Sequence, residues 1–524
     1  MRPAAANSPS RAAWVNPAAR NTPDAILSAP RPFWLAALAL ILVSLVPFFA
    51  VDVPAVLDYP NHLARIFVLA HSDDPILSRF YMPQWRILPN LGFDVLGVAL
   101  LKILPVHVGG RILLAISMVA PVLGVFVYAR AAFGKLSLWP LASITTAFNG
   151  IFFLGFMNFL LATGLAFAAA GAWLSLRRAG RDGWCLVLGG VSTALLFFCH
   201  LFGVLLFAFL IGCQEFAQPP RLSRQRLRAL MMIAVALTPA LLLYFASPLS
   251  DQVAGAGGWD GKHKLWGLFI PFMTNSKPTT LVTALFVVCF VILHWRQALF
   301  APGTKLALIV LGLLYVVAPV TLKGGTLIDI RLSLLMGLLV FAGVEPQFSR
   351  AWKKPVLAAI FLLVGLRSLV TGLAWYDHRR DLADLRTTFA QIPEGARALA
   401  ALSENTETDG ANAARILPDV QRLDTHLPAL MVIERKAFWS HLFADPAQQP
   451  FVAKPPYDRI ADPSGEVPQW PSLFAAATPL PRMAHWRDDF DYVLLIDRPG
   501  SLKTPENFIP VRLGTYTALW RLEH

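Results

Sequence analysis

Long apolar stretches, each close to the length of a membrane-spanning helix, follow one another from residue 33 to residue 374. A hydrocarbon core about 30 Å thick is crossed by roughly 20 helical residues. The stretches lie at 33–51, 111–129, 137–154, 157–176, 184–200, 201–217, 229–247, 279–295, 305–321, 331–345 and 355–374. They predict an α-helical polytopic membrane protein with about eleven transmembrane helices. The chain contains 56% hydrophobic and only 15% charged residues, and this composition excludes a soluble multidomain enzyme.

Basic residues gather between these stretches, and their positions predict the orientation of the chain. The clusters are Arg11 and Arg20, Arg130 and Lys135, Arg177 and Arg178, Arg221 to Arg228, Arg296 and Lys305, and Arg350 to Lys354. All of them fall on one side of the membrane if the N-terminus is cytoplasmic. The formal net charge of +13 is then a feature of membrane topology, so we expect no nucleic-acid partner. Frequent alanine, and arginine in preference to lysine, indicates a multi-pass protein of a bacterial inner membrane.

Two apolar stretches, 137–176 and 184–217, are too long for single helices and are expected to form hairpins. Their outer turns are predicted near Gly155-Phe156 and near His200-Leu201. The stretch 89–105 is also apolar, but as a span it would move Arg130 and the following lysine to the outer side. We therefore expect 89–105 to lie along the outer interface.

The same orientation divides the chain into three parts. We expect a cytoplasmic tail at 1–32, a transmembrane domain at 33–375 with a first outer loop at 52–110, and an extracytoplasmic domain at 376–524. The composition after Trp375 is that of a soluble domain. Strands are predicted at 429–433, 492–496 and 516–522, and helix around 383–402, which together indicate a small α/β domain.

The densest group of ionisable residues at any membrane boundary follows the first span, in the segment Asp58-Tyr59-Pro60-Asn61-His62-Leu63-Ala64-Arg65. If a helix begins after Pro60, His62 and Arg65 are three residues apart and share a face, with Asp58 just before them. A carboxylate, an imidazole and a guanidinium would then meet at the headgroup level, where such residues are often functional. The alternative is that Asp58 caps the helix and Arg65 contacts lipid headgroups.

At this point the chain resembles a known family, the GT-C glycosyltransferases, among them protein mannosyltransferases and aminoarabinose transferases. The resemblance rests on the layout of the spans, the segment from Asp58 to Arg65, Pro89-Asn90-Leu91-Gly92-Phe93 with Arg111 later, and Asp329-Ile330-Arg331-Leu332 opening a late span. It implies a GT-C-like fold and a sugar donor linked to a polyprenyl phosphate. Several members have a second acidic residue in the next outer loop, whereas 153–158 contains none, so metal dependence is doubtful.

The resemblance implies that Asp58 is the catalytic base and that Arg331, with Asp329 two residues before it, faces the lipid phosphate. The chemistry requires the same residue types, because sugar transfer to a hydroxyl needs a base near the attacking oxygen and cations near the departing phosphate. His62, Arg65 and His200 are the further substrate-binding candidates, although His200 could equally be a packing residue. No metal ligands are assigned. Asp73-Asp74 could bind a divalent cation, but the flanking Ser72 and Pro75 indicate a turn.

These observations predict a membrane glycosyltransferase that transfers a sugar from a polyprenyl-phosphate donor to an extracytoplasmic glycan, lipid or protein acceptor. The alternative is a non-enzymatic protein, either a transporter or flippase of lipid-linked glycans or an assembly component. A transporter should carry ionisable residues within its spans, whereas here they gather at the outer face. The sequence also lacks the pair of broken helices that inverted repeats produce.

Overall fold

Each of the eleven predicted apolar stretches coincides with a helix in the computed structural model, which describes residues 31–217, 224–252, 255–322, 325–403, 414–418, 421–475, 481–500 and 504–523. These helices are α1 (Arg31–Leu45), α5 (Val106–Phe133), α6 (Gly150–Leu154), α7 (Met157–Arg178), α8 (Asp182–Cys199), α9 (Leu201–Phe216), α10 (Arg224–Ala246), α12 (Lys277–His294), α13 (Thr304–Val317), α14 (Ile328–Gly343) and α15 (Arg350–Phe389). The 3-10 helices η3 (Val46–Phe49) and η4 (Trp139–Thr146) extend the first and third stretches. In the described part of the chain, seven helices have the length and hydropathy to cross a membrane. Eleven crossings therefore stay a prediction, and most of the expected tail at 1–32 lies outside the described residues.

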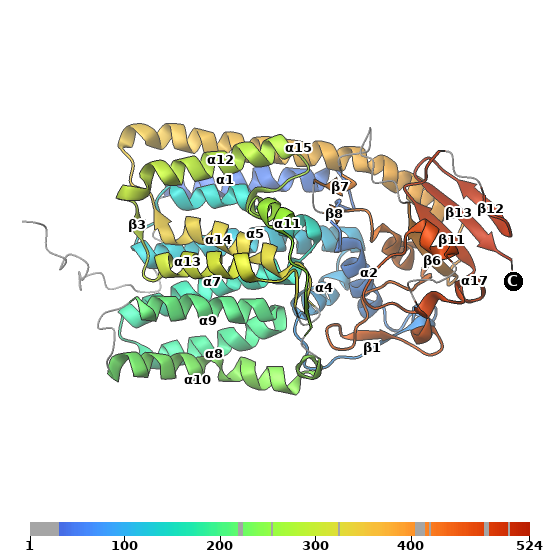
Figure 1. Cartoon of the computed structure of the whole chain (residues 1–524), viewed down its shortest axis with the longest axis horizontal. Helices are drawn as coiled ribbons and strands as arrows, with labels where there is room; N and C mark the ends of the chain where they lie inside the picture. Colours follow the sequence, from blue (N-terminus) through green and yellow to red (C-terminus); the bar gives the residue numbers. More distant parts are fainter. Residues whose placement is uncertain are drawn as a thin grey trace, which may run out of the picture.

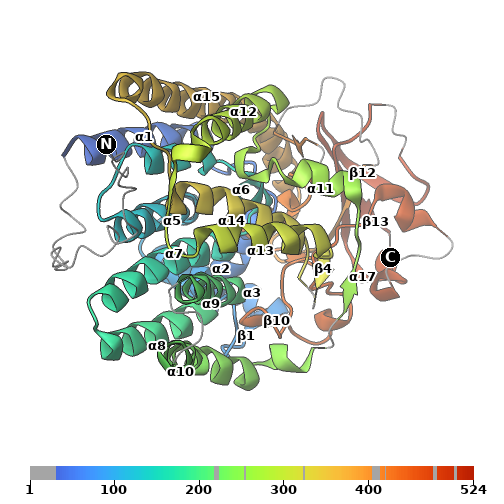
Figure 2. The same cartoon turned by 60° about the vertical axis from the view of Figure 1, so that its left-hand side comes forward.

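The long helices lie side by side along the length of the molecule, and a sheet domain occupies one end (Figure 1). The view in Figure 2 shows α8, α9 and α10 on one side of the bundle and α12 and α15 on the other. Where α5 and α7 cross, both helices have a glycine in place of a residue with a side chain. A Cβ atom on Gly124 would collide with the carbonyl of Gly164, and a Cβ on Gly164 would collide with that of Ala120. Small residues therefore let these two backbones touch, as is common between membrane helices.

The segment between α1 and α5 contains α2 (Tyr59–Ala70), α3 (Leu77–Phe80), β1 (Tyr81–Pro83) and α4 (Gly92–Leu101). The ten residues of α4 are about 15 Å long, roughly half the thickness of a bilayer core. This helix is the apolar stretch that we expected at the outer interface. It packs on α2, where Gly97 faces Ile66, and on α5.

The C-terminal domain is built on a five-stranded mixed sheet in the order β12-β13-β11-β6-β9. Its strands are β6 (Arg397–Leu402), β9 (Phe438–Trp439), β11 (Tyr492–Ile496), β12 (Phe508–Leu513) and β13 (Thr517–Leu522), and it also contains α16 (Leu430–Arg435) and α17 (Trp486–Asp489). The strands β11, β6 and the edge strand β9 are parallel, and β13 is antiparallel to both of its neighbours. The small α/β domain is confirmed, as are the strands near 492–496 and 516–522.

Two local predictions in this domain are wrong. Residues 430–435 form α16 and not a strand, because a short buried apolar run has no periodicity that separates helix from strand. Residues 397–402 form strand β6 and not a continuation of the helix that ends at Phe389. The sequence Arg-Ala-Leu-Ala-Ala-Leu resembles a helix in composition, but it is buried between two parallel strands, where near-continuous apolar runs are the rule.

Shorter strands complete the description of the chain. They are β2 (Ala256–Gly257) with β4 (Thr321–Leu322), β3 (Leu299–Phe300) with β5 (Val344–Glu345), β7 (Ile416–Leu417) with β8 (Gln421–Arg422), and β1 with β10 (Phe451–Ala453). The last pair matters for the site, because β1 precedes α4 and β10 belongs to the C-terminal domain. The segment between α1 and α5 is thereby joined to that domain by strand pairing.

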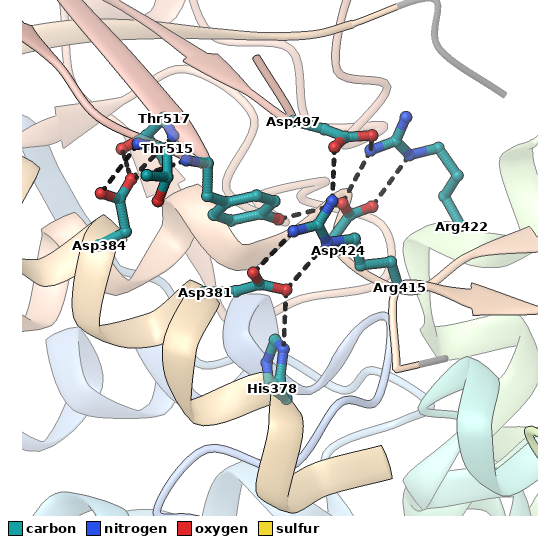
Figure 3. Close-up of polar contacts among 10 residues, drawn as sticks. His378, Asp381, Asp384, Arg415, Arg422, Asp424, Asp497, Thr515 and Thr517 are labelled. Atoms are coloured by element: carbon teal, nitrogen blue, oxygen red, sulfur yellow. Dashed lines mark hydrogen bonds and ion pairs between the residues drawn. The ribbon is translucent and has the colours of Figure 1, made fainter. Parts of the chain in front are cut away.

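The helix α15 runs from the bundle into the C-terminal domain, where ion pairs fix it (Figure 3). Asp381 accepts hydrogen bonds from Arg415 at 2.7 and 2.9 Å, and Nη1 of Arg415 bonds Asp497 at 2.8 Å. Arg422 bridges Asp497 and Asp424, at 3.0 and 2.7 Å. These charges are mostly shielded from water and satisfy one another, so the end of α15 and the domain move as one unit.

Candidate active site

The backbone of Asp58 is held against the turn that joins α6 to α7. The N–H of Asp58 donates to the carbonyl of Leu154 at 3.3 Å, and that of Leu57 donates to the carbonyl of Phe153 at 2.9 Å. Gly155 in this turn has a φ of +86°, and a Cβ on it would lie 2.8 Å from Asp58. Only glycine fits such a position. The turn predicted near Gly155 therefore positions the predicted base.

The side chain of Asp58 faces the C-terminal domain. Its Oδ1 lies 3.1 Å from Nδ1 of His426, while the side chain as a whole is 14% exposed. It makes no capping bond to α2, so the helix-cap alternative is not supported. Within the described residues, Oδ2 of Asp58 has no hydrogen-bond partner. One carboxylate oxygen is thus held by an imidazole and the other is free to accept a proton.

His62 lies one helical turn after Asp58, on α2, and its ring packs against Phe443 with the centroids 5.4 Å apart. Burial lowers the pKa of His62 well below its usual range, with a further contribution from the charges of Arg65 and His426. In the part of the chain that the structure describes, no hydrogen bond engages the His62 ring. It is therefore a neutral imidazole available to a bound molecule.

Asn61 fastens the C-terminal domain to this turn of α2. Its Nδ2 donates to the carbonyl of His441 at 2.9 Å, and its Oδ1 accepts from the N–H of Phe443 at 2.8 Å. The side chain is fully buried. Two hydrogen bonds from one amide define the position of the domain relative to α2, and hence relative to Asp58.

Arg331, in the first turn of α14, is enclosed by three phenyl rings. Its guanidinium carbon lies 4.3 Å from the ring centroid of Phe156, 5.5 Å from that of Phe159 and 5.6 Å from that of Phe202. Such rings attract a cation and exclude water from it. Nη2 donates to the carbonyl of Thr326 at 2.9 Å, whereas Nε is buried and has no partner among the residues that the structure describes. The carboxylate of Asp58 is among the charges that act on this guanidinium.

His200 lies beside Arg331, in the turn between α8 and α9 that the sequence predicts. Its Nε2 is 3.2 Å from Nη1 of Arg331, and its Nδ1 accepts from the N–H of Phe202 at 3.0 Å. Because Nδ1 accepts, a neutral ring carries its one proton on Nε2, which therefore cannot accept a hydrogen bond from Arg331. His200 caps α9 through Nδ1, and its role as a donor to a phosphate stays a prediction.

Two of the predicted substrate-binding residues are engaged elsewhere. Arg65 forms a two-fold ion pair with Asp94 of α4, at 2.8 and 3.0 Å, with side chains 2% and 0% exposed. The guanidinium of Arg65 is therefore engaged by a carboxylate of α4 and does not face a ligand site. Asp329 is bound by Lys264 of α11 (Gly261–Gly267) at 3.2 Å and lies 3.6 Å from His263. We therefore leave Arg65 and Asp329 out of the direct contacts of the candidate site.

The site does not assemble a metal-binding group. Among the described residues, no three His, Cys, Asp or Glu side chains are arranged to hold a metal ion. Asp74, a possible cation ligand in the sequence, instead pairs with Lys436 at 2.7 Å and accepts the N–H groups of Ile76 and Leu77.

The fold is similar to that of a known protein. ArnT from Cupriavidus metallidurans, in a crystal structure bound to undecaprenyl phosphate, superposes with a TM-score of 0.50 at 12% identity, over 94% of this chain and 98% of that one. Its apo structure gives 0.46. No protein-family model matches the sequence, and no curated protein matches it significantly. The predicted GT-C-like membrane fold is thus confirmed, as a likeness of fold.

Sequence reasoning missed His426, the structural role of Asn61 and the phenyl rings around Arg331. His426 comes from a soluble segment far along the chain, and no spacing rule connects it to Asp58. The sequence does not distinguish the phenylalanines around Arg331 from the many other phenylalanines of the spans. Only Phe156 carried a usable signal, because it follows the glycine of the predicted turn.

Proposed function

We propose that the protein is a membrane glycosyltransferase that takes a sugar from a polyprenyl-phosphate donor. The observation that carries this proposal is a carboxylate with one free oxygen, Asp58, whose charge acts on a cation in an apolar enclosure, Arg331, on a GT-C-like fold. These are the two groups that transfer from a phosphate to a hydroxyl requires.

In the proposed reaction, the hydroxyl of the acceptor gives its proton to Oδ2 of Asp58. The hydroxyl oxygen bonds to the anomeric carbon, and the bond from that carbon to the phosphate oxygen breaks, leaving its electron pair on the phosphate. Arg331 stabilises the departing phosphate through the donors that the protein leaves unpaired, above all its buried Nε. His62 supplies a neutral imidazole to the sugar or to the acceptor.

The polyprenyl phosphate is supported by the ligand named for the ArnT structure, undecaprenyl phosphate. Arginine also suits this ligand, because a planar guanidinium recognises phosphate through paired hydrogen bonds. By the distribution of basic clusters, the N-terminus lies in the cytoplasm of a bacterium and the site opens at the outer face of the inner membrane. The acceptor is then an extracytoplasmic glycan, lipid or protein.

Binding of undecaprenyl phosphate to the purified protein tests the phosphate contact. Native mass spectrometry should show one bound lipid, which uncharged undecaprenol does not displace. Arg331→Ala should abolish this adduct and Arg331→Lys should weaken it, because lysine keeps the charge without the planar fork. Arg498→Ala is the matched control, since Arg498 bonds Gly514 in the C-terminal domain. Equal binding by wild type and Arg331→Ala would remove Arg331 from the site. Binding without sugar transfer would favour a flippase.

A further inference from the structure

The C-terminal domain reaches the candidate base through one side chain, His426. Its Nε2 lies 3.0 Å from the carbonyl of Gly465, and its Nδ1 lies 3.1 Å from Oδ1 of Asp58. A carbonyl can only accept, so Nε2 carries a hydrogen. A neutral imidazole has one N–H, which leaves a lone pair on Nδ1 beside a carboxylate oxygen, and among the described residues Nδ1 makes no hydrogen bond.

A second proton between Nδ1 and Oδ1 removes this repulsion. The geometry therefore favours an imidazolium of His426 beside an ionised Asp58. His200 is the opposite case, because its Nδ1 accepts a hydrogen bond.

The surroundings hold the His426 ring in this orientation. It is 7% exposed, and it packs edge-on against Phe443 with the centroids 5.1 Å apart. The backbone N–H of Phe443 is bonded to Asn61 of α2, and a Cβ on Gly465 would collide with the Phe443 ring. The contact between the domain and Asp58 is thus built into the packing and does not depend on a mobile surface side chain.

We propose that His426 is a positioning residue for Asp58, so that the C-terminal domain forms part of the active site. The imidazolium forms an ion pair with Oδ1 and leaves Oδ2 open to the acceptor hydroxyl. His426 keeps both of its protons during the reaction, and the proton of the acceptor goes to Oδ2. This inference rests on the proposed glycosyl transfer and adds a residue to it.

Other titratable groups surround the pair and are unchanged in the His426 and Asp58 variants. His62 approaches from α2 and Arg331 acts on Asp58 from α14. On the side of the C-terminal domain, His441 acts on His426, and Asp462 acts on His441. A change that follows substitution of His426 alone therefore reports on the contact between His426 and Asp58.

Two substitutions separate the nitrogens of His426. His426→Gln places an amide near the position of Nε2 and preserves the contact with Gly465, but it loses the contact with Asp58. His426→Asn places its amide near Nδ1 and keeps a neutral donor to Asp58. His441→Asn is the matched control, because His441 is equally buried in the same domain and keeps its Nδ1-type contact with Ser440.

The readouts are kcat and KM for sugar transfer, normalised to folded protein. His426→Gln should lower kcat about tenfold or more while the KM for the donor stays close to that of the wild type, because the carboxylate loses its alignment with the acceptor hydroxyl. His426→Asn should recover most of kcat, and His441→Asn should follow the wild type. A wild-type kcat in His426→Gln would overturn the inference, as would failure of His426→Asn to recover kcat.

Thermal unfolding tests the contact without relying on activity. The Tm shifts of Asp58→Asn and of His426→Asn should not add in the double variant, because each removes charge from the same pair. Additive shifts would overturn the contact. If wild type transfers no sugar from any polyprenyl-phosphate donor, the proposed function is wrong. The Tm shifts of the single and double variants still show whether Asp58 and His426 interact. If Asp58→Asn is inactive and His426→Gln is normal, only the inference fails.

Discussion

Asp58→Asn removes the proton acceptor of the proposed reaction while keeping the size of the side chain. Loss of a general base slows a reaction by about 10² to 10⁴, which corresponds to about 3 to 5 kcal/mol in the activation barrier. The structural effect is smaller. The variant loses the charge next to His426, which costs about 1 to 3 kcal/mol of stability when a charged partner is removed. The backbone bond to Leu154 stays, so folding should survive.

The assay is the initial rate of labelled sugar transfer from an undecaprenyl-phosphate donor in proteoliposomes, per amount of folded protein. Asp52→Asn is the matched control. Asp52 lies in the same segment and pairs with Arg386 at 2.5 Å, but it is 38% exposed and makes no contact with Asp58 or His426 among the described residues. We expect this control to transfer normally. A rate for Asp58→Asn within about threefold of wild type would refute the assignment of the base, since the expected loss is at least about 10².

Three further predictions concern the fold. Arg65→Met should lower the free energy of unfolding by about 3 to 5 kcal/mol in chemical denaturation, because the buried Asp94 is left without its partner, while the KM for the donor in folded protein stays unchanged; a raised KM with normal stability would return Arg65 to the site. Burial, opposed by Asp462, lowers the pKa of His441 to about 4 in the folded state, against about 6.5 unfolded. The stability that this shift gives is present above pH 6.5, and the free energy of unfolding should fall by about 3 kcal/mol as the pH falls towards 4. His441→Asn should flatten the fall of Tm over that range. An equally steep fall of Tm in the variant would contradict this role of His441. A reporter fused after Lys354 should be cytoplasmic and one at Gly500 extracytoplasmic, as measured with paired phosphatase and fluorescent fusions; the reverse result would contradict the topology.

The membrane part could be predicted because a single physical constraint fixes it. The thickness of the bilayer sets the length of the apolar stretches, and basic residues mark their cytoplasmic ends. The turns at Gly155 and at His200 follow from dividing over-long stretches, and they lie where we expected them. Arg331 was predicted in another way, from the resemblance of the segment Asp329-Ile330-Arg331-Leu332 to the GT-C pattern.

The C-terminal domain and half of the site could not be predicted in this way. The strand β6 and the helix α16 are both short, buried and apolar, so only tertiary contacts decide between helix and strand. The partners of Arg65 and Asp58 depend on which charge the fold brings nearest. Asp94 was visible in the sequence as a charge within an apolar helix, whereas nothing in the sequence indicated that His426 reaches Asp58.

The 40 residues of α15 form a rod about 60 Å long, twice the thickness of a bilayer core. Each added residue would rotate everything beyond it by about 100° around the helix axis. Because Asp381 is clamped to Arg415, the C-terminal domain would turn with the rod and carry His426 away from Asp58. The rotational phase of one helix thus sets the alignment of the two halves of the site, and only insertions close to whole turns could preserve it.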